Sequence, residues 1–318
     1  MEIDVQTAEA IEIDACLRTI GAVFRAAAFW EEIRRTLTPK FYCWKYDAPA
    51  GSAVVVAAKE GGRMASMLSA VPFHYSRGDV EQRGWQICDI ATLPEFRGRG
   101  LYRRCLQALI HELPPGDLLI CFPNRNSSHE LFKQSFTRIA ELTTFGRPIL
   151  FFGRAEPEGA ERHVFPHSLS PPAEDCLRVS KHFDYFMWRY IRDPVHRYFV
   201  HVDQRPGEPD AIIVMRSFNI GRFSVGLIME LHASNPKVQH RLIRTAVKWA
   251  AANRLKALLI VSSGLSLWAG MRLGFLPVPA FLTPKRHIVV GRLAGAPGEL
   301  PALLRGRWHF HIGDWDGL

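Results

Sequence analysis

Short apolar runs alternate with longer amphipathic stretches along the chain, and their order occurs twice. In the first half, three apolar runs are typical of strands, namely SAVVVAA (52–58), SMLSAVPF (66–73) and QICDIATLP (86–94). LYRRCLQALIHEL (101–113) then has the apolar spacing of a helix, and DLLICF (117–122) is a short buried strand. The pattern predicts strands, a long helix, a further strand and a short helix that ends near Phe136.

The second half repeats this order. Its segments are YFVHV (198–202), AIIVMRSF (211–218), VGLIMELHASNP (225–236), VQHRLIRTAVKWAAANR (238–254) and ALLIVS (257–262). The motif WKYDAP (44–49) recurs as WRYIRDP (188–194), and equivalent positions lie about 140 residues apart. We therefore expect a duplicated α+β unit, with a mixed α/β sheet flanked by helices.

One stretch separates the two copies. RAEPEGAERHVFPHSLSPPAED (154–175) is rich in proline, glycine and charge and has no clean period. We expect a first domain at 1–153, a linker at 154–176 and a second domain at 177–318.

Composition narrows the class of protein. Of 318 residues, 47% are hydrophobic and 22% are charged, which excludes a disordered chain or a coiled coil. The net charge of +9 suits an anionic partner, which could be a phosphorylated cofactor, nucleic acid or a membrane surface, and does not choose among them. The six cysteines form no C-x-x-C pair, and no apolar run approaches the ~20 residues that span a bilayer. We expect a soluble cytoplasmic protein.

The stretch LPEFRGRGLYRR (93–104) carries the most specific signal. Two glycines alternate with arginines in a turn between a strand and a helix. Glycine permits positive φ, and a helix N-terminus offers free N–H groups, so the turn could hold a diphosphate. Neither a Walker A loop nor a G-x-G-x-x-G fingerprint fits the sequence. The alternative is an ordinary helix start with solvated arginines.

The whole pattern resembles the acyl-CoA-binding motif of the GNAT superfamily of N-acetyltransferases. The motif P-x-x-[RQ]-G-x-G-[LI] is present as Pro94, Arg97, Gly98, Gly100 and Leu101. PNRNSSHELFKQSF (123–136) is similar to the family's next segment, an Asn followed by a short helix. The resemblance, best over 45–145, implies tandem GNAT-like acyl-CoA N-acyltransferase domains.

The resemblance also implies a set of cofactor-binding residues. The co-substrate would be acetyl-CoA or another acyl-CoA, and no metal is expected. The strand would hold the pantetheine arm, and the turn with the helix start would hold the pyrophosphate. Asn124, Ser127 and Ser128 would contact CoA, although the serines could equally be helix caps. The strand and turn residues are Ile90, Ala91, Thr92, Leu93, Arg97, Gly98, Arg99, Gly100, Leu101 and Tyr102.

Proton transfer needs separate candidates. The resemblance makes Asp89 the first choice as general base, because many family members carry an acidic residue that acts through water near this end of the strand. Strand alternation would put Asp89, Ala91 and Leu93 on one face. The alternative is a carboxylate that pairs with a cation. His74 on the preceding hairpin could reach the same site or could simply be exposed. Many family members use a tyrosine on the short helix as acid, and ELFKQSF (130–136) has none.

The second copy departs from the motif. ASNPKVQHRL (233–242) lacks the Arg-Gly-x-Gly turn, although LGF (273–275) is kept. We expect one working CoA site and a degenerate second copy. The ending GDWD (313–316) is similar to tandem members linked to amino-sugar modification, so a nucleotide-linked amino sugar is one possible acceptor.

These observations predict an N-acyltransferase acting on a primary amine of a small molecule, with neither nucleic acid nor membrane as partner; the oligomeric state is left open. A non-catalytic acyl-CoA sensor or scaffold is the main alternative. An RNA-binding protein is a weaker one, since no RNP, KH or zinc signature is present. His309 and His311 alternate on one strand face, but spacing fixes no third metal ligand. We therefore expect a terminal strand and turn there.

Overall fold

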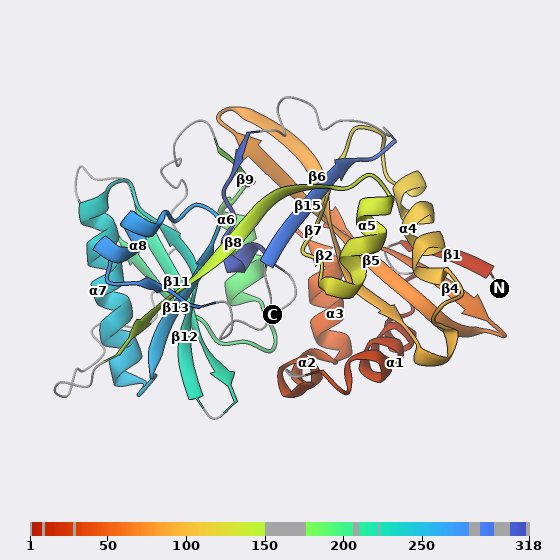
Figure 1. Ribbon diagram of the computed structural model, residues 1–318, viewed down its shortest axis with the longest axis horizontal. Coiled ribbons are helices and arrows are strands. Elements are labelled where there is room, and N and C mark those ends of the chain that lie inside the picture. The colour runs from red at the N-terminus through yellow and green to blue at the C-terminus, as the bar shows by residue number, and fades with distance from the viewer. Residues whose placement is uncertain are drawn as a thin grey trace.

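The fold consists of two halves joined by one continuous sheet (Figure 1). The computed structural model describes residues 2–7, 10–27, 30–149, 176–205, 210–221, 223–279, 287–295 and 306–315. The predicted linker therefore lies outside the described residues, except for Cys176, which begins a strand. The first half comprises residues 2–149 and the second half comprises residues 176–315.

The first half contains the strands and helices that the apolar pattern predicts, preceded by helices that pack on the sheet. Its sheet follows the order β1-β4-β5-β6-β7, antiparallel except for the parallel β6–β7 pair. The strands are β1 (Glu2–Thr7), the small hairpin β2 (Asp47–Ala48) and β3 (Gly51–Ser52), β4 (Val54–Glu60), β5 (Arg63–Arg77), β6 (Val80–Thr92) and β7 (Leu118–Cys121). The helices are α1 (Ile13–Phe24), α2 (Trp30–Thr36), α3 (Pro39–Tyr46), the 3₁₀ turn Pro94–Phe96, α4 (Leu101–Glu112) and α5 (Arg125–Lys133).

The second half follows the same order of elements, as the repeated sequence pattern predicts. Its strands run β13-β12-β11-β10, again with one parallel pair, β12–β13. The elements are β9 (Cys176–Val179), α6 (Phe183–Phe186) continued by a π-helical turn at Met187–Ile191, β10 (Phe199–Asp203), β11 (Ala211–Ile220), β12 (Phe223–His232), α7 (Pro236–Ala252), β13 (Ala257–Ser262), α8 (Leu267–Arg272) and β14 (Leu276–Pro277). The last described elements are β16 (Arg307–Trp308) and a 3₁₀ turn at Ile312–Asp314.

Two strands cross from one half to the other and unite the sheet. β15 (His287–Leu293), from the second half of the sequence, pairs with β7 in the first half. β8 (Thr137–Pro148), from the first half, pairs with β15 at its start and with β13 of the second half at its end. Figure 1 shows both strands in the middle of the molecule. Each half is therefore completed by a strand from the other half of the sequence.

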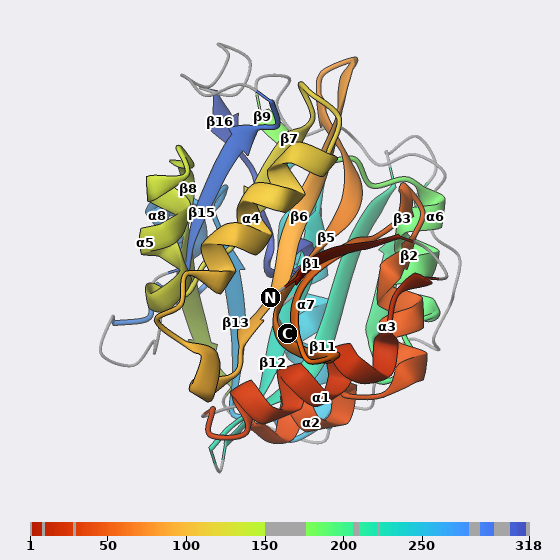
Figure 2. The same ribbon diagram turned by 90° about the vertical axis from the view of Figure 1, so that its right-hand side faces the viewer.

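Three apolar clusters fill the fold. One packs α4 against β4–β7 on the outer face of the first half, and Figure 2 shows α4 crossing this face. A second packs α7 on the outer face of β11–β13. The third and largest lies between the halves and takes side chains from α1, α3, both sheets and the C-terminal segment. The two halves consequently share one core rather than touching at a surface.

A stacked tryptophan pair connects the two halves. The rings of Trp44 and Trp188 stack with centroids 5.1 Å apart. The Trp44 indole N–H donates to the Trp188 carbonyl at 2.8 Å, and the Trp188 indole N–H donates to the Trp44 carbonyl at 2.9 Å. This reciprocal contact joins the two occurrences of the WKYDAP and WRYIRDP motif.

Candidate acyl-CoA site

The candidate site begins where β6 and β7 stop pairing. Their parallel ladder runs from Gly84 and Leu118 to Ile87 and Cys121. Beyond Ile87, the β6 residues pair only with β5 among the described residues. One edge of β6 is thus left without a strand partner at its carboxyl end, and an extended ligand arm can add there like a further strand.

A β-bulge changes the course of β6 at this point. Cys88 pairs with Ser69 and Ala91 pairs with Met67, so Asp89 and Ile90 lie opposite the single residue Leu68. Asp89 has φ of +51°, which is unusual for a residue other than glycine. Such strained positions gather at functional sites, and this one lies one residue before the predicted pantetheine strand.

The glycine turn follows directly. Gly98 and Gly100 have φ of +76° and +70°, and an added Cβ would meet no atom within 4 Å at either position. Glycine is therefore required by the backbone conformation, and the space beside the turn is open.

Helix α4 begins at this turn with free donors. Gly100 is its N-cap, and no side chain in the described part of the chain caps it. The N–H groups of the first turn consequently remain available, at the positive end of the helix dipole. An open turn with free N–H groups is what a pyrophosphate site requires.

Arginines surround the turn without being fixed in place. Arg97 donates from Nε to the Thr92 carbonyl at 3.3 Å. Arg99 pairs with Glu60 at 3.3 Å and retains 52% of its side-chain exposure. Exposed ion pairs of this kind contribute only about 0–1 kcal/mol, so these guanidinium groups can turn to a phosphate at little cost.

The residues after β7 have a local role that the sequence left open. The Asn124 side chain accepts from the N–H groups of Asn126 and Ser127, and the Ser127 hydroxyl accepts from the Asn124 N–H. This capping box starts α5 and uses both side chains. A contact of Asn124, Ser127 or Ser128 with CoA stays a prediction. The capping box by itself accounts for the presence of Asn124 and Ser127, with no CoA contact.

Tyr102 points inward from the first turn of α4. It packs on the outer core cluster, and its hydroxyl is buried without a hydrogen-bond partner among the described residues. Burial, with smaller effects of Cys121 and Glu130, raises the pKa of the Tyr102 hydroxyl. An unpaired buried hydroxyl is costly, so this O–H is available to a ligand that reaches it.

Asp89 occupies a different environment from the one expected of a free base. Its carboxylate accepts from Lys45 Nζ at 2.7 Å, Ser69 Oγ at 2.8 Å and the Tyr46 hydroxyl at 2.9 Å. Burial raises the pKa of Asp89, but the Lys45 ammonium and these hydrogen bonds outweigh it and lower the pKa. A low-pKa, ion-paired carboxylate is a poor proton acceptor.

The end of β6 overturns one sequence argument. Asp89 and Ala91 face the core shared by both halves, whereas Leu93 belongs to the outer cluster under α4. The expected common face of Asp89, Ala91 and Leu93 is therefore wrong for Leu93. Alternation holds from Asp89 to Ala91 and fails at Leu93, because Leu93 lies beyond the end of β6.

His74 lies far from this site. It is exposed and pairs with Arg83 on the β5–β6 hairpin. Five residues of β5 separate it from Ser69, which pairs beside the bulge, so the distance is roughly 17 Å. The structure does not bring His74 together with Asp89 or the glycine turn, and this geometry gives it no role in proton transfer there.

The equivalent region of the second half is occupied. The β12–β13 ladder ends at Ile228 and Ile260, as the β6–β7 ladder ends at Ile87 and Cys121. Beyond it, Ser262 bridges His311, and the Ser263 N–H donates to the Phe310 carbonyl at 3.0 Å. The chain's own C-terminal segment thus lies in the gap where β12 and β13 separate, the counterpart of the gap beside β6 that stays open in the first half.

Comparison with known proteins identifies the fold and the family of the first half. Residues 20–136 match the acetyltransferase (GNAT) family, so this part of the chain is a GNAT acetyltransferase domain. A GCN5-related N-acetyltransferase from Anabaena variabilis aligns with a TM-score of 0.61 at 11% identity, over 92% of this chain and 73% of that one. Saccharomyces cerevisiae N-myristoyltransferase with bound myristoyl-CoA aligns with a TM-score of 0.57 at 11% identity, over 94% and 80%. A search of curated sequences finds no significant match.

The fold is therefore that of GNAT N-acyltransferases, and residues 20–136 carry the match to the family's acetyltransferase domain, as the sequence motif predicts. The family match includes Pro94, Gly98 and Gly100, the residues that carry the resemblance. None of the described helices is both long and apolar enough to span a bilayer.

Proposed function

We propose that the protein transfers an acetyl or longer acyl group from acyl-CoA to a primary amine of a small molecule. The open turn formed by Gly98 and Gly100 at the unpaired edge of β6 is the observation that carries the proposal. The pyrophosphate would bind the turn and the first N–H groups of α4. The pantetheine arm would lie along Ile90–Leu93 as an added strand.

The transfer itself needs an activated carbonyl and a free amine. Backbone N–H groups near Ala91 would polarise the thioester carbonyl and stabilise the oxyanion that forms when the amine attacks. Because Asp89 is ion-paired, we propose that water removes the proton from the amine. The hydroxyl of Tyr102 is a candidate donor to the departing thiolate, since it is buried and unpartnered within the described part of the chain.

The second half has a supporting role in this proposal. Its turn lacks the glycines, and its C-terminal segment lies in the equivalent gap between β12 and β13. For these two reasons, we propose a single CoA site per chain. The proposed domains remain 1–153 and 177–318, with two crossing strands shared between them.

The acceptor is proposed from charge and sequence. A net charge of +9 favours an acceptor with phosphates, and the terminal GDWD motif supports a nucleotide-linked amino sugar. Asp316 of this motif lies outside the described residues. A cytoplasmic location would give the enzyme its acyl-CoA.

A panel of amines tests the proposal. Acetyl-CoA is supplied with amino-sugar nucleotides, amino sugars and simple primary amines, and release of free CoA thiol is followed. Turnover of at least one amine is expected, and Tyr102→Phe should lower kcat about 10-fold with little change in the KM for acetyl-CoA.

The same panel separates the alternatives. Tight binding of acetyl-CoA without turnover of any amine would favour a sensor or scaffold instead. Turnover of simple amines but not of amino-sugar nucleotides would remove the proposed acceptor and leave the transferase in place.

A further inference from the structure

Four chemically unusual side chains meet between the end of β12 and the C-terminal segment. Glu230 is fully buried, and its Oε2 lies 2.9 Å from His232 Nε2. His311, 4% exposed, lies beside them, with its ring centroid 5.3 Å from that of His232. One ligand atom from each of Glu230, His232 and His311 lies within 4.8 Å of the other two. The fourth side chain, Lys181, contacts the same carboxylate.

His311 lacks the partners that a buried imidazole needs. Among the described residues, neither of its ring nitrogens has a hydrogen-bond partner. A buried polar atom without a partner is rare in folded proteins and often marks an ion or water site. The ring lies against His232 and Glu230, so the missing partner belongs in the space these three side chains share.

The three side chains offer donor atoms that transition metals prefer. Each histidine supplies an imidazole nitrogen, and Glu230 supplies carboxylate oxygens. Two imidazoles and one carboxylate form a common ligand set for Zn²⁺ and related ions.

Lys181 is the main objection to a cation here. Its Nζ lies 2.6 Å from Glu230 Oε2 and 2.7 Å from Asp314 Oδ1, and it is buried. Two carboxylates face this one ammonium, however, so Asp314 can hold Lys181 when Glu230 binds a metal. The local charge is consistent with a bound cation. When Lys181, Glu230 and Asp314 are all ionised, their net charge is −1.

The ligand atoms need only a small adjustment. Ligands of a tetrahedral Zn²⁺ at 2.0–2.1 Å lie about 3.4 Å from one another. The Glu230–His232 distance of 2.9 Å would have to open by about 0.5 Å, and His311 would swing by at most about 1.5 Å.

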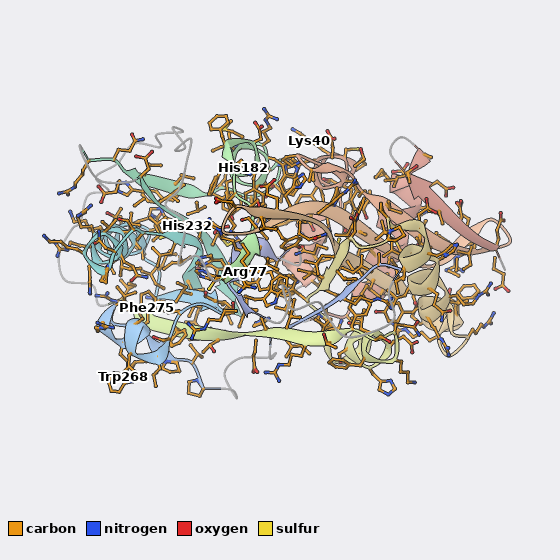
Figure 3. All side chains as sticks on the ribbon, turned by 90° about the horizontal axis from the view of Figure 1, so that it is seen from above. Lys40, Arg77, His182, His232, Trp268 and Phe275 are labelled. Atoms are coloured by element: carbon orange, nitrogen blue, oxygen red, sulfur yellow. The ribbon has the colours of Figure 1, made fainter. Side chains whose placement is uncertain are left out.

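An open route leads to these side chains. His232 and Lys181 line a cavity of about 400 Å³ with Ser76, Arg178, Ser180 and His182. Figure 3 shows His232 within the second half and His182 nearer the outside. A metal ion could enter by this route, and a fourth coordination position would face the cavity.

We propose that Glu230, His232 and His311 form a binding site for a divalent transition-metal ion, with Zn²⁺ as the natural probe. The ion would join the C-terminal segment to β12 and hold that segment over the edge of β13. The sequence predicted no metal because spacing fixed no third ligand to His309 or His311; tertiary contacts bring Glu230 and His232 to His311, from about 80 residues earlier in the chain.

Titration of the full-length, tag-free protein tests the site. The protein is treated with EDTA, dialysed and titrated with ZnCl₂ by calorimetry, and its thermal midpoint is recorded with and without metal. Wild type should bind one ion per chain and gain thermal stability. His232→Gln and His311→Gln should each weaken binding at least 10-fold and lose the thermal gain. His182→Gln, at an exposed ring lining the same cavity, is the matched control and should bind as wild type does.

Three results would overturn the proposal: no binding by wild type, binding that neither substitution alters, or equal loss in His182→Gln. If His311→Gln fails to fold, His232→Gln decides alone, because its ring lies at the cavity wall. Titration with Co²⁺ adds a direct test, since imidazole ligation produces visible absorption that the His232→Gln protein should lack.

Discussion

At the scale of single residues, the pairing of Asp89 decides whether it serves structure or proton transfer. Asp89→Asn keeps a residue that tolerates positive φ, but it leaves Lys45 buried without a carboxylate. We expect a loss of about 3 kcal/mol in the free energy of unfolding at pH 7, measured by urea denaturation. The exposed Asp79→Asn should change stability little.

The difference in unfolding free energy between wild type and Asp89→Asn depends on pH, and the direction of the Asp89 pKa shift determines how. Because the folded-state pKa of Asp89 is lowered, its stabilisation is present above the unfolded pKa near 3.9 and is lost as pH falls through the folded value. The gap between wild type and Asp89→Asn should therefore narrow below about pH 4. A stable variant at neutral pH with a large loss of kcat would instead make Asp89 the base.

Residue-level prediction succeeded where the backbone is specified by residue type. Gly98 and Gly100 are needed for positive φ, and that requirement is visible in the sequence. The environment of Asp89 was not visible, because its partners Lys45 and Tyr46 come from α3 and the bulge rotates the strand. Three-dimensional contacts, not spacing, decide such a pKa.

At the scale of elements, the Trp44–Trp188 pair holds α3 and the π-helical turn of the second half together. Trp44→Phe removes the indole N–H that donates to the Trp188 carbonyl, so we expect a loss of about 1–2 kcal/mol in unfolding free energy. Trp188→Phe should cost a similar amount, because the contact is reciprocal. Trp268→Phe is the control, since Trp268 is 71% exposed at the outer edge of α8 (Figure 3).

Denaturation of the three variants gives the answer. A loss of unfolding free energy for Trp268→Phe as large as that of the other two variants, or no loss for any of the three, would contradict the role of the pair.

The strands named in the sequence analysis and both long helices were predictable, because the spacing of apolar residues identified them. The crossing of β8 and β15 was not, since an apolar strand does not specify its neighbours.

At the scale of the whole molecule, the exchanged strands make the halves interdependent. A fragment of residues 1–153 lacks β15, and a fragment of 154–318 lacks β8. We expect neither fragment alone to unfold cooperatively, because each loses an internal strand and half of the shared core. Co-expressed fragments should associate and together bind acetyl-CoA.

Circular dichroism melts and gel filtration of each fragment measure this. A 1–153 fragment that is monomeric, melts cooperatively and binds acetyl-CoA would show that the first half is an independent domain.

The order of the strands and helices could be predicted from the sequence. The joining of the two halves could not, because it depends on strand pairing between residues far apart in the chain.

The most direct test of the account is calorimetric titration of acetyl-CoA into wild type, Gly100→Glu and Gly221→Glu. Gly221 is the matched control, because it also has positive φ and open space around it, but lies in a β11–β12 turn of the second half. We predict a dissociation constant on the order of micromolar for wild type and Gly221→Glu. Gly100→Glu should bind at least 10-fold more weakly, since its carboxylate would repel the pyrophosphate. No binding by wild type, or equal binding by Gly100→Glu, would contradict the assignment of the glycine turn as the acyl-CoA site.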